Sequence, residues 1–506
     1  MERLSKALIA DMRSKGIDID LSLSILDDWN SGFYDKVRPV KAKTVPSVDG
    51  RRVIDTDALT ELRLPLSRAL AVLDPLGIPL PREAGNGAEI IFDRLSLEEI
   101  GLRLLSFAAW GVLNGGSATS YADRKKNRAY GDEVFALLEE GFERLEPLCR
   151  DRPKGLAPAF LNPDGSPGPS FLILKMRARL LLARRYRNQF GDAGRAFLPL
   201  FQMSSSGNDA ELASAYRSMA GDSLLAKLAK GLGGVEASGA LSWATGIQPL
   251  IAAFTHSSEG RTKRIFDRAW GRPDTSLALP GGHGQSFRVL AKVFRELEAS
   301  GVRWAWLGNV DNMGFVPDPV RFAVFALSGE PAAFEFAYRT PLDVKGGILV
   351  EMENGGRTIA DIGPAISFEE VARLEAEGSS ILFNCATGLF DLKWLVPRLD
   401  EIGRALPVRF TDQDKDAGRY SQAEQVTWEI ASLLPSFLAF AVRKEDRFIA
   451  AKLLAETLLA SGVGAGDPKI PPELASAATT LHRGLTARLE GEYGLRLRSG
   501  RWTALD

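Results

Sequence analysis

Cysteine is nearly missing from this chain, which has Cys149 and Cys385 as its two cysteines among 506 residues. They lie far apart in the sequence, which excludes a disulfide framework and a cysteine-rich metal site. Long apolar runs are missing as well, because no segment approaches the roughly 20 apolar residues of a membrane span and the N-terminus lacks a signal-peptide stretch. These absences predict a cytoplasmic protein with no membrane partner.

An excess of charge of one sign is also absent, since 63 Lys+Arg face 64 Asp+Glu and the formal net charge is -1. A chain without a basic field does not recruit nucleic acid as a bulk polyanion, so an anionic substrate must be met by local groups. Hydrophobic residues make up 45% and charged residues 25%, the mixture of an ordinary folded protein. The length exceeds a single core of about 250 to 300 residues, so we expect two or three domains.

The first hundred residues show mainly helical periodicity. Residues 1–35 are typical of two short amphipathic helices, and a basic, proline-containing stretch at 36–52 resembles a linker. Helical spacing returns at 58–73 and 96–107. We therefore predict an N-terminal helical region over residues 1–100.

The middle of the chain alternates short apolar runs with amphipathic helices, which is typical of parallel strands joined by crossover helices. We predict an α/β catalytic domain over 101–450 and a C-terminal helical region over 451–506. Helices are expected at 286–301 and at 367–378, where Ser367 and Glu370 form a capping box. The candidate strands are residues 108–113, 196–203, 303–308, 333–338 and 379–384.

Two glycine loops are candidate ligand sites. Gly115 and Gly116 directly follow the first strand, where backbone N–H groups can approach a phosphate or a base. That loop lacks the dinucleotide fingerprint and the P-loop lysine, and an ordinary turn is the alternative. Gly282 and His283 precede a helix N-terminus, which suits an anion or a nucleotide, although a lone histidine is more often structural.

Charged groups near other strand ends complete the candidates. Lys154 lies on a short rigid turn and suits a phosphate oxygen, although a lone lysine is usually a solvated surface group. Asp311 follows the strand at 303–308, and a carboxylate at such a tip can bind Mg²⁺ together with substrate phosphates. Asn309 beside it suits a hydroxylated ligand, whereas an Asx-rich turn is the alternative. The stretches 335–347, 383–384 and 447–452 are weaker signals.

Taken in order, these segments resemble the family of UTP-glucose-1-phosphate uridylyltransferases and the related UDP-N-acetylhexosamine pyrophosphorylases over about residues 107–452. Leu-Asn-Gly-Gly and Thr-Ser at 113–120 resemble the nucleotide loop, although Ser-Ala replaces a further glycine at 117–118. Pro-Lys-Gly-Leu at 153–156 resembles the lysine turn, displaced by an apparent insertion over 121–152. Lys125 or Lys126 is therefore an alternative to Lys154.

The resemblance implies an α/β fold of the nucleotide-diphospho-sugar transferase type, Rossmann-like with a mixed, mostly parallel sheet and helical regions at both ends. It also implies in-line attack of a sugar 1-phosphate on the α-phosphorus of UTP, with Mg²⁺ as the cofactor. Asp311 is by resemblance the metal ligand, and Lys154 and Lys452 are the catalytic phosphate lysines. The implied nucleotide contacts are Gly115, Gly116, Thr119, Met203, Gly282 and His283. The implied sugar contacts are Asn309, Glu335, Gly346 and Asn384.

The resemblance favours glucose 1-phosphate as the sugar substrate and UDP-glucose as the product, with N-acetylglucosamine 1-phosphate as the alternative. Asn-Gly-Gly, Thr-Ser and Asp-Val-Lys-Gly-Gly at 343–347 resemble the glucose 1-phosphate branch, while Pro-Lys-Gly-Leu is closer to the N-acetylglucosamine 1-phosphate branch. The altered residues 117–118 also leave a non-catalytic nucleotide-sugar-binding homologue as an alternative. Eukaryotic members continue into a β-helix, whereas 54 residues of helical pattern follow Lys452 here, so a monomer is expected.

Overall fold

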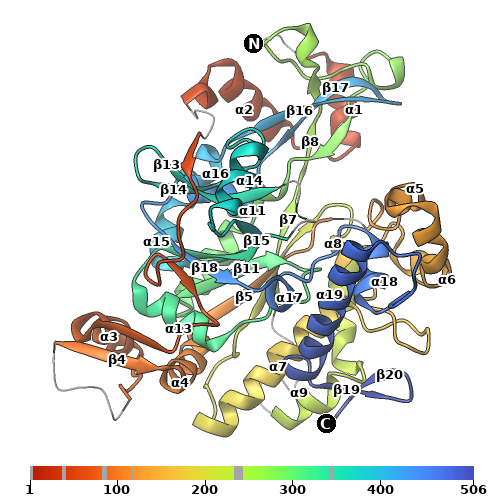
Figure 1. Cartoon of the computed structure of the whole chain (residues 1–506). Helices are drawn as coiled ribbons and strands as arrows, with labels where there is room; N and C mark the ends of the chain where they lie inside the picture. Colours follow the sequence, from red (N-terminus) through yellow and green to blue (C-terminus); the bar gives the residue numbers. More distant parts are fainter. Residues whose placement is uncertain are drawn as a thin grey trace.

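A computed structural model describes residues 4–36, 41–81, 88–116, 118–232, 243–340, 343 and 346–505 (Figure 1). Within these ranges the centre of the molecule is a mixed sheet of 11 strands. The main path runs through β2 (Val53–Asp55), β18 (Leu438–Val442), β12 (Ala332–Tyr338), β15 (Leu382–Asp391), β11 (Trp304–Asn309), β5 (Ala108–Leu113), β6 (Leu200–Ser205) and β7 (Trp243–Gln248). Strand β13 (Gly347–Met352) pairs with β15, and β14 (Arg357–Asp361) and β1 (Ala42–Thr44) pair with β13.

Strand β5 shows why the sheet carries helices on both faces. All six of its residues are buried, and its side chains alternate between two hydrophobic clusters. Trp110 and Val112 join the cluster that contains α4 (Arg94–Leu104), α7 (Phe171–Phe190) and α13 (Pro319–Ser328). Ala109 and Leu113 join the cluster that contains α11 (Ser286–Val289), α12 (Ala291–Ala299) and α16 (Leu399–Ala405). A central strand buried on both faces is apolar throughout, which explains why the sequence revealed it.

The predicted α/β fold class is confirmed. Strands β5, β6, β7 and β11 are parallel neighbours, and β12, β18 and β2 form a second parallel group. The antiparallel strand β15 joins the two groups, so the sheet is mixed and mostly parallel, as expected. The predicted helix at 367–378 is present as α14 (Phe368–Ala376), with Ser367 accepting a hydrogen bond from the Glu370 amide.

The N-terminal hundred residues are not wholly helical, which corrects the prediction. The first two predicted helices are present as α1 (Lys6–Ser14) and α2 (Ile19–Asn30). The expected linker carries β1 and leads into β2, both of which join the main sheet. The helix expected at 58–73 begins as a strand, because β3 (Glu61–Pro65) pairs with β4 (Glu89–Asp93) before α3 (Leu66–Leu73) starts. The domain boundaries at residues 100 and 450 stay predictions.

The C-terminal region contains the expected helices and one hairpin that the helical pattern did not indicate. The helices are α18 (Leu454–Ala460) and α19 (Pro472–Gly491), and the hairpin pairs β19 (Leu495–Arg498) with β20 (Arg501–Ala504). The apparent insertion forms α5 (Arg124–Asn127) and α6 (Asp132–Cys149), and α6 packs against α18 (Figure 1). Along the described ranges, every helix is too short or too polar to span a membrane.

A smaller layer lies at the top of Figure 1. There β16 (Arg409–Lys415), β17 (Gly418–Glu424) and β9 (Phe254–Thr255) make one sheet, and β8 (Leu250–Ala252) pairs with β10 (Ala278–Pro280). Helices α1 and α2 pack against this layer through their apolar faces. The other helices are α8 (Asp209–Ser218), α9 (Ala226–Leu232), α15 (Leu392–Leu395) and α17 (Lys444–Arg447).

Candidate active site

The carboxyl ends of four parallel strands meet at one edge of the main sheet. Asn309 of β11 pairs with Leu113 of β5, Leu113 pairs with Met203 of β6, and Met203 pairs with Gly246 of β7. The loops that follow these strands therefore lie side by side. In open α/β sheets, ligands bind in the crevice outside such strand ends.

The loop after β5 is fixed by a buried asparagine. Asn114 is 1% exposed, and its Oδ1 accepts a hydrogen bond of 3.0 Å from the Gly155 amide. Its Nδ2 donates to Gln202 Oε1 at 3.1 Å, and its carbonyl accepts from Asn208 Nδ2 at 3.0 Å. One side chain thus joins the first glycine loop to the lysine turn and to β6.

The two glycines of this loop have different surroundings. A Cβ at Gly115 would lie 3.2 Å from Gln248 Oε1 and 3.3 Å from the Ser204 carbonyl, so the backbone passes closely between neighbouring loops. A Cβ at Gly116 would meet no heavy atom of the described residues within 4 Å. The exposed Thr119 donates to Asp151 Oδ1 at 3.0 Å, and Ser117 lies outside the described residues.

The lysine turn lies directly beside this loop although the insertion separates them in sequence. The Lys154 amide donates to the Gly116 carbonyl at 3.2 Å, and the Ala118 amide donates to the Arg152 carbonyl at 2.9 Å. The two ends of the insertion therefore lie next to each other, beside the first glycine loop. Its helix α6 packs on α18, so the added residues extend the side of the molecule without separating the two motifs.

Lys154 and Asp311 form an ion pair at the sheet edge. The side chains of Lys154 and Asp311 are 18% and 12% exposed, and Lys154 Nζ also donates to the Ala451 carbonyl at 2.6 Å. The next residue, Lys452, has an exposed side chain. Lys126, one of the alternatives, donates to Ser120 Oγ at 2.9 Å, so the geometry favours Lys154 as the lysine beside the carboxylate.

The second glycine loop is held between β7 and the segment after β17. Gly282 adopts a φ of 81°, and its carbonyl accepts a hydrogen bond of 2.6 Å from Gln248 Nε2. A Cβ at Gly282 would lie 2.4 Å from the Gln425 carbonyl, so both space and backbone conformation require glycine. The Gly281 carbonyl accepts from the Gln425 amide, and the Gly284 amide donates to the Gln425 carbonyl.

Gln248 is a site residue that the sequence did not reveal. It ends β7, lies against Gly115 with its Oε1, and donates with its Nε2 to the carbonyl of Gly282. The two predicted glycine loops are therefore connected through one amide side chain. Strand β7 has no long apolar run, and recognising it would have marked Gln248 as a polar residue at a strand end.

His283 is held in one orientation by Thr427. The Thr427 amide donates to His283 Nδ1 at 3.1 Å, and Thr427 Oγ1 donates to the His283 carbonyl at 2.7 Å. An accepting Nδ1 requires the tautomer that carries its proton on Nε2. Burial lowers the pKa of His283 to about 4, so the ring is neutral at pH 7 and offers Nε2–H as a donor.

Glu335 and Met203 are more buried than their predicted roles require. Glu335 is 0% exposed, and both its carboxylate oxygens accept hydrogen bonds from the Arg447 guanidinium at 2.6 to 3.2 Å. The carboxylate therefore has no surface for a hexose in this conformation, and it anchors α17 instead. Met203 is 2% exposed, and its side chain packs in the core beside β5.

The other predicted sugar contacts lie along the strand ends. Asn309 is half-buried at the end of β11, and Asn384 is half-buried on β15 with its Oδ1 accepting from the Ala386 amide at 3.0 Å. Gly346 has a φ of 144°, and a Cβ there would lie 2.4 Å from the Phe383 ring. The predicted Asp-Val-Lys-Gly-Gly stretch is described only in part, because residues 344 and 345 lie outside the described residues.

A family model matches the second part of the chain. Residues 262–461 match the model described as UTP--glucose-1-phosphate uridylyltransferase. The match spans less than half of the 506 residues, and it includes the Gly282 loop, Asp311 and Lys452. The resemblance to UDP-glucose and UDP-N-acetylglucosamine pyrophosphorylases that the sequence indicated is confirmed. No curated protein matches the chain with significance.

Solved structures of such pyrophosphorylases share the fold. A mutant UDP-glucose pyrophosphorylase from Leishmania major aligns with a TM-score of 0.55 at 17% identity, covering 91% of this chain and 79% of that one. The UDP-N-acetylglucosamine pyrophosphorylase from Trypanosoma brucei, solved with an inhibitor, aligns with a TM-score of 0.57 at 15% identity, covering 96% and 91%. At these identities the likeness establishes the fold.

Asp311 is a carboxylate that could hold a magnesium ion at the sheet edge. Among the residues that the structure describes, no three His, Cys, Asp or Glu side chains gather to cage a metal ion. Mg²⁺ commonly takes one or two protein carboxylates and completes its octahedron with substrate phosphates and waters. Asp311 would supply the carboxylate, and the neighbouring Lys154 and glycine loops suit the phosphates.

The low pKa of His283 makes the stability of the protein depend on pH. Its ordinary pKa of 6.5 applies in the unfolded chain, so the unfolded state binds the proton first as the pH falls. Stability should therefore decrease from about pH 6.5 to about pH 4. His283→Asn places an acceptor near the Nδ1 position and does not titrate, so we expect the variant to lose less stability between pH 7 and pH 5.

Urea unfolding of both proteins at the two pH values measures this difference. An equal loss of the unfolding free energy in the wild type and in His283→Asn would show that the histidine does not contribute to the pH dependence.

Proposed function

We propose that this chain is a magnesium-dependent uridylyltransferase that joins a sugar 1-phosphate to UTP and releases pyrophosphate. Glucose 1-phosphate is the proposed sugar substrate and UDP-glucose the product. The observation that carries the proposal is the ion pair of Lys154 and Asp311 at the sheet edge, flanked by glycine loops that Gln248 connects. This edge combines a cation, a candidate metal ligand and two glycine loops that a nucleotide could approach closely.

The proposed reaction needs positioning more than proton transfer. A phosphate oxygen of the sugar 1-phosphate forms a bond to the α-phosphorus of UTP, while the bond from that phosphorus to the oxygen bridging to the β-phosphate breaks. Pyrophosphate leaves with the electron pair. The attacking oxygen is already ionised at neutral pH, so no general base is required, and the site must align two anions and stabilise developing charge.

The residues of the site suit these tasks. Bound Mg²⁺ would neutralise charge on the triphosphate. The Lys154 ammonium is mostly withdrawn from water, which strengthens its attraction to a phosphate oxygen. The loop at Gly115 brings the backbone close to neighbouring strands. His283 is neutral and offers an N–H donor, so the positive charge at the site comes from Lys154.

A panel of sugar phosphates tests this proposal. We expect the purified protein to release pyrophosphate from UTP and Mg²⁺ with glucose 1-phosphate, and more slowly with N-acetylglucosamine 1-phosphate. The coupled assay gives kcat/KM for each sugar. A faster reaction with the acetylated sugar would reverse the preference and keep the reaction type.

Absence of turnover with every sugar would contradict the enzyme proposal. The non-catalytic alternative predicts that the same protein binds UDP-glucose without converting it, which calorimetry with UDP-glucose measures. Equal rates with both sugars would defeat the assignment of a preferred substrate.

A further inference from the structure

The turn formed by residues 311–315, called here the Asp311 turn, rests on two buried side chains from distant parts of the sequence. Lys175 Nζ of α7 donates to the Asn312 carbonyl at 2.5 Å and to the Phe315 carbonyl at 2.7 Å. Tyr493, just beyond α19, donates its hydroxyl to the Met313 carbonyl at 2.8 Å. Two buried side chains thus form hydrogen bonds with three carbonyls of one short turn.

Lys175 occupies a position that is costly for a lysine. It is 0% exposed, and its Nζ lies 5.6 Å and 5.3 Å from the ring centroids of Trp110 and Phe315. Burial lowers the pKa of Lys175 well below its ordinary value, while the nearby Asp311 carboxylate opposes this shift. A buried lysine needs hydrogen-bond partners to offset the loss of hydration, and two carbonyls of the Asp311 turn are such partners.

Tyr493 is tied to the same helix that carries Lys175. Tyr493 is 0% exposed, and Arg177 of α7 donates through Nε to the Tyr493 carbonyl at 2.6 Å and through Nη2 to the Gly494 carbonyl at 3.1 Å. Burial raises the pKa of Tyr493, so its hydroxyl keeps the proton that it donates. Helix α7 therefore fixes the Asp311 turn directly and fixes the tyrosine that supports it.

The C-terminal region also supports the Asp311 turn indirectly, through α17. A Cβ at Gly484 of α19 would lie 2.1 Å from the Glu445 carbonyl, so α19 packs closely on α17. Asn312 in turn donates its Nδ2 to the Arg447 carbonyl at the end of α17 at 2.9 Å and accepts from the Ile449 amide at 3.0 Å. Movement of α19 would therefore disturb both the Tyr493 hydrogen bond and the contact through α17.

We propose that Lys175 of α7 and Tyr493, just beyond α19, are positioning residues that hold the Asp311 turn in place, so that α7 and the C-terminal region share this task. Both are fully buried and act through backbone carbonyls of the turn. The support of the turn by Lys175 and Tyr493 is a property of the ligand-free chain, whereas its effect on Mg²⁺ binding rests on the proposed uridylyltransferase function.

Hydrogen exchange on the ligand-free chain tests this support of the turn. Tyr493→Phe removes one hydroxyl and keeps the ring, so we expect amides in peptides covering residues 307–318 to exchange about fivefold faster, as expected for one lost hydrogen bond. Lys175→Met should give a larger increase there. Tyr420→Phe is a control, because it removes a hydroxyl from a buried tyrosine of β17, a strand of a separate sheet. We expect its exchange rates in these peptides to equal those of the wild type.

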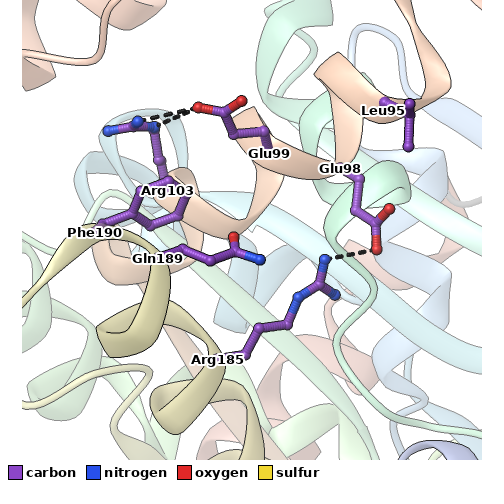
Figure 2. A pocket seen from close by; sticks show the side chains of 7 residues that line it. All are labelled: Leu95, Glu98, Glu99, Arg103, Arg185, Gln189 and Phe190. Atoms are coloured by element: carbon purple, nitrogen blue, oxygen red, sulfur yellow. Dashed lines mark hydrogen bonds and ion pairs between the residues drawn. The ribbon is translucent and has the colours of Figure 1, made fainter.

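A second control lies on the exposed end of α7. Arg185 forms an ion pair of 2.7 Å with Glu98 of α4 in the groove that Figure 2 shows, where Arg103 also pairs with Glu99. Such exposed pairs contribute little to stability. Arg185→Gln therefore perturbs the same helix without touching the Asp311 turn, and its exchange at 307–318 should equal that of the wild type.

The kinetic consequence separates positioning from general stability. We expect Tyr493→Phe to lower kcat and raise the half-activating Mg²⁺ concentration, each about fivefold, with an unchanged KM for the sugar 1-phosphate. Unchanged exchange at 307–318, or faster exchange throughout the protein, would overturn the inference. Absence of turnover in the wild type would contradict the proposed function alone, because the exchange result still decides the role of Tyr493.

Discussion

Asp311→Asn should lower kcat for pyrophosphate release by at least about 10²–10³-fold, as is typical when a group that stabilises transition-state charge is removed. The asparagine has nearly the same shape, so it can fill the same place on the turn. It lacks the negative charge that pairs with Lys154 and that would hold Mg²⁺. The rate at saturating UTP, sugar phosphate and Mg²⁺ measures the loss.

A matched control is available on the β16–β17 hairpin. Asp414 is 80% exposed there, so Asp414→Asn makes the same chemical change away from the strand ends. We expect its kcat to equal that of the wild type. A kcat for Asp311→Asn within tenfold of the wild type would show that the carboxylate is not the metal ligand.

Arg447→Met should reduce the free energy of unfolding by about 3–5 kcal/mol, the usual cost of leaving one member of a buried ion pair without its partner. Glu335 is 0% exposed, and both of its carboxylate oxygens accept hydrogen bonds from this guanidinium. Arg447 also donates to the Val316 carbonyl at 2.8 Å, so the substitution removes support from the segment after the Asp311 turn. Urea unfolding gives the change in stability.

The double variant Glu335→Gln/Arg447→Met is the control for the buried charge. It removes the carboxylate charge that the single variant leaves unpaired, so we expect it to be more stable than Arg447→Met alone. A loss below about 1 kcal/mol in the single variant would contradict the account, because it would match an exposed pair. If the double variant loses as much as the single variant, the unpaired charge is not the cause.

The sequence predicted the parts of the fold that have strong local patterns. Strands β5, β6, β11 and β12 are rich in apolar residues, and nearly all of their residues are buried. Gly115, Gly116 and Asp311 stood out because they follow such runs, whereas Gly282 and His283 stood out because they precede a helix. The motifs before and after the 121–152 insertion also proved to be neighbours, as the Lys154 amide bonded to the Gly116 carbonyl shows.

Features that depend on distant partners were not predictable from local pattern. Strands β1 and β2 have three residues each, which is too short for a period, and they exist because the main sheet offers them an edge. The burial of Glu335 follows from Arg447, which lies over a hundred residues later. Lys175 and Tyr493 resemble ordinary helix residues in sequence, and only the folded chain brings them under the Asp311 turn.

A crystal of the protein soaked with UTP and Mg²⁺ shows directly whether Asp311 holds the metal ion. We expect Mg²⁺ within about 2.1 Å of an Asp311 oxygen and bound also to triphosphate oxygens, with Lys154 moved from the carboxylate to a phosphate. A triphosphate bound at another place, with Asp311 still paired to Lys154, would contradict this expectation.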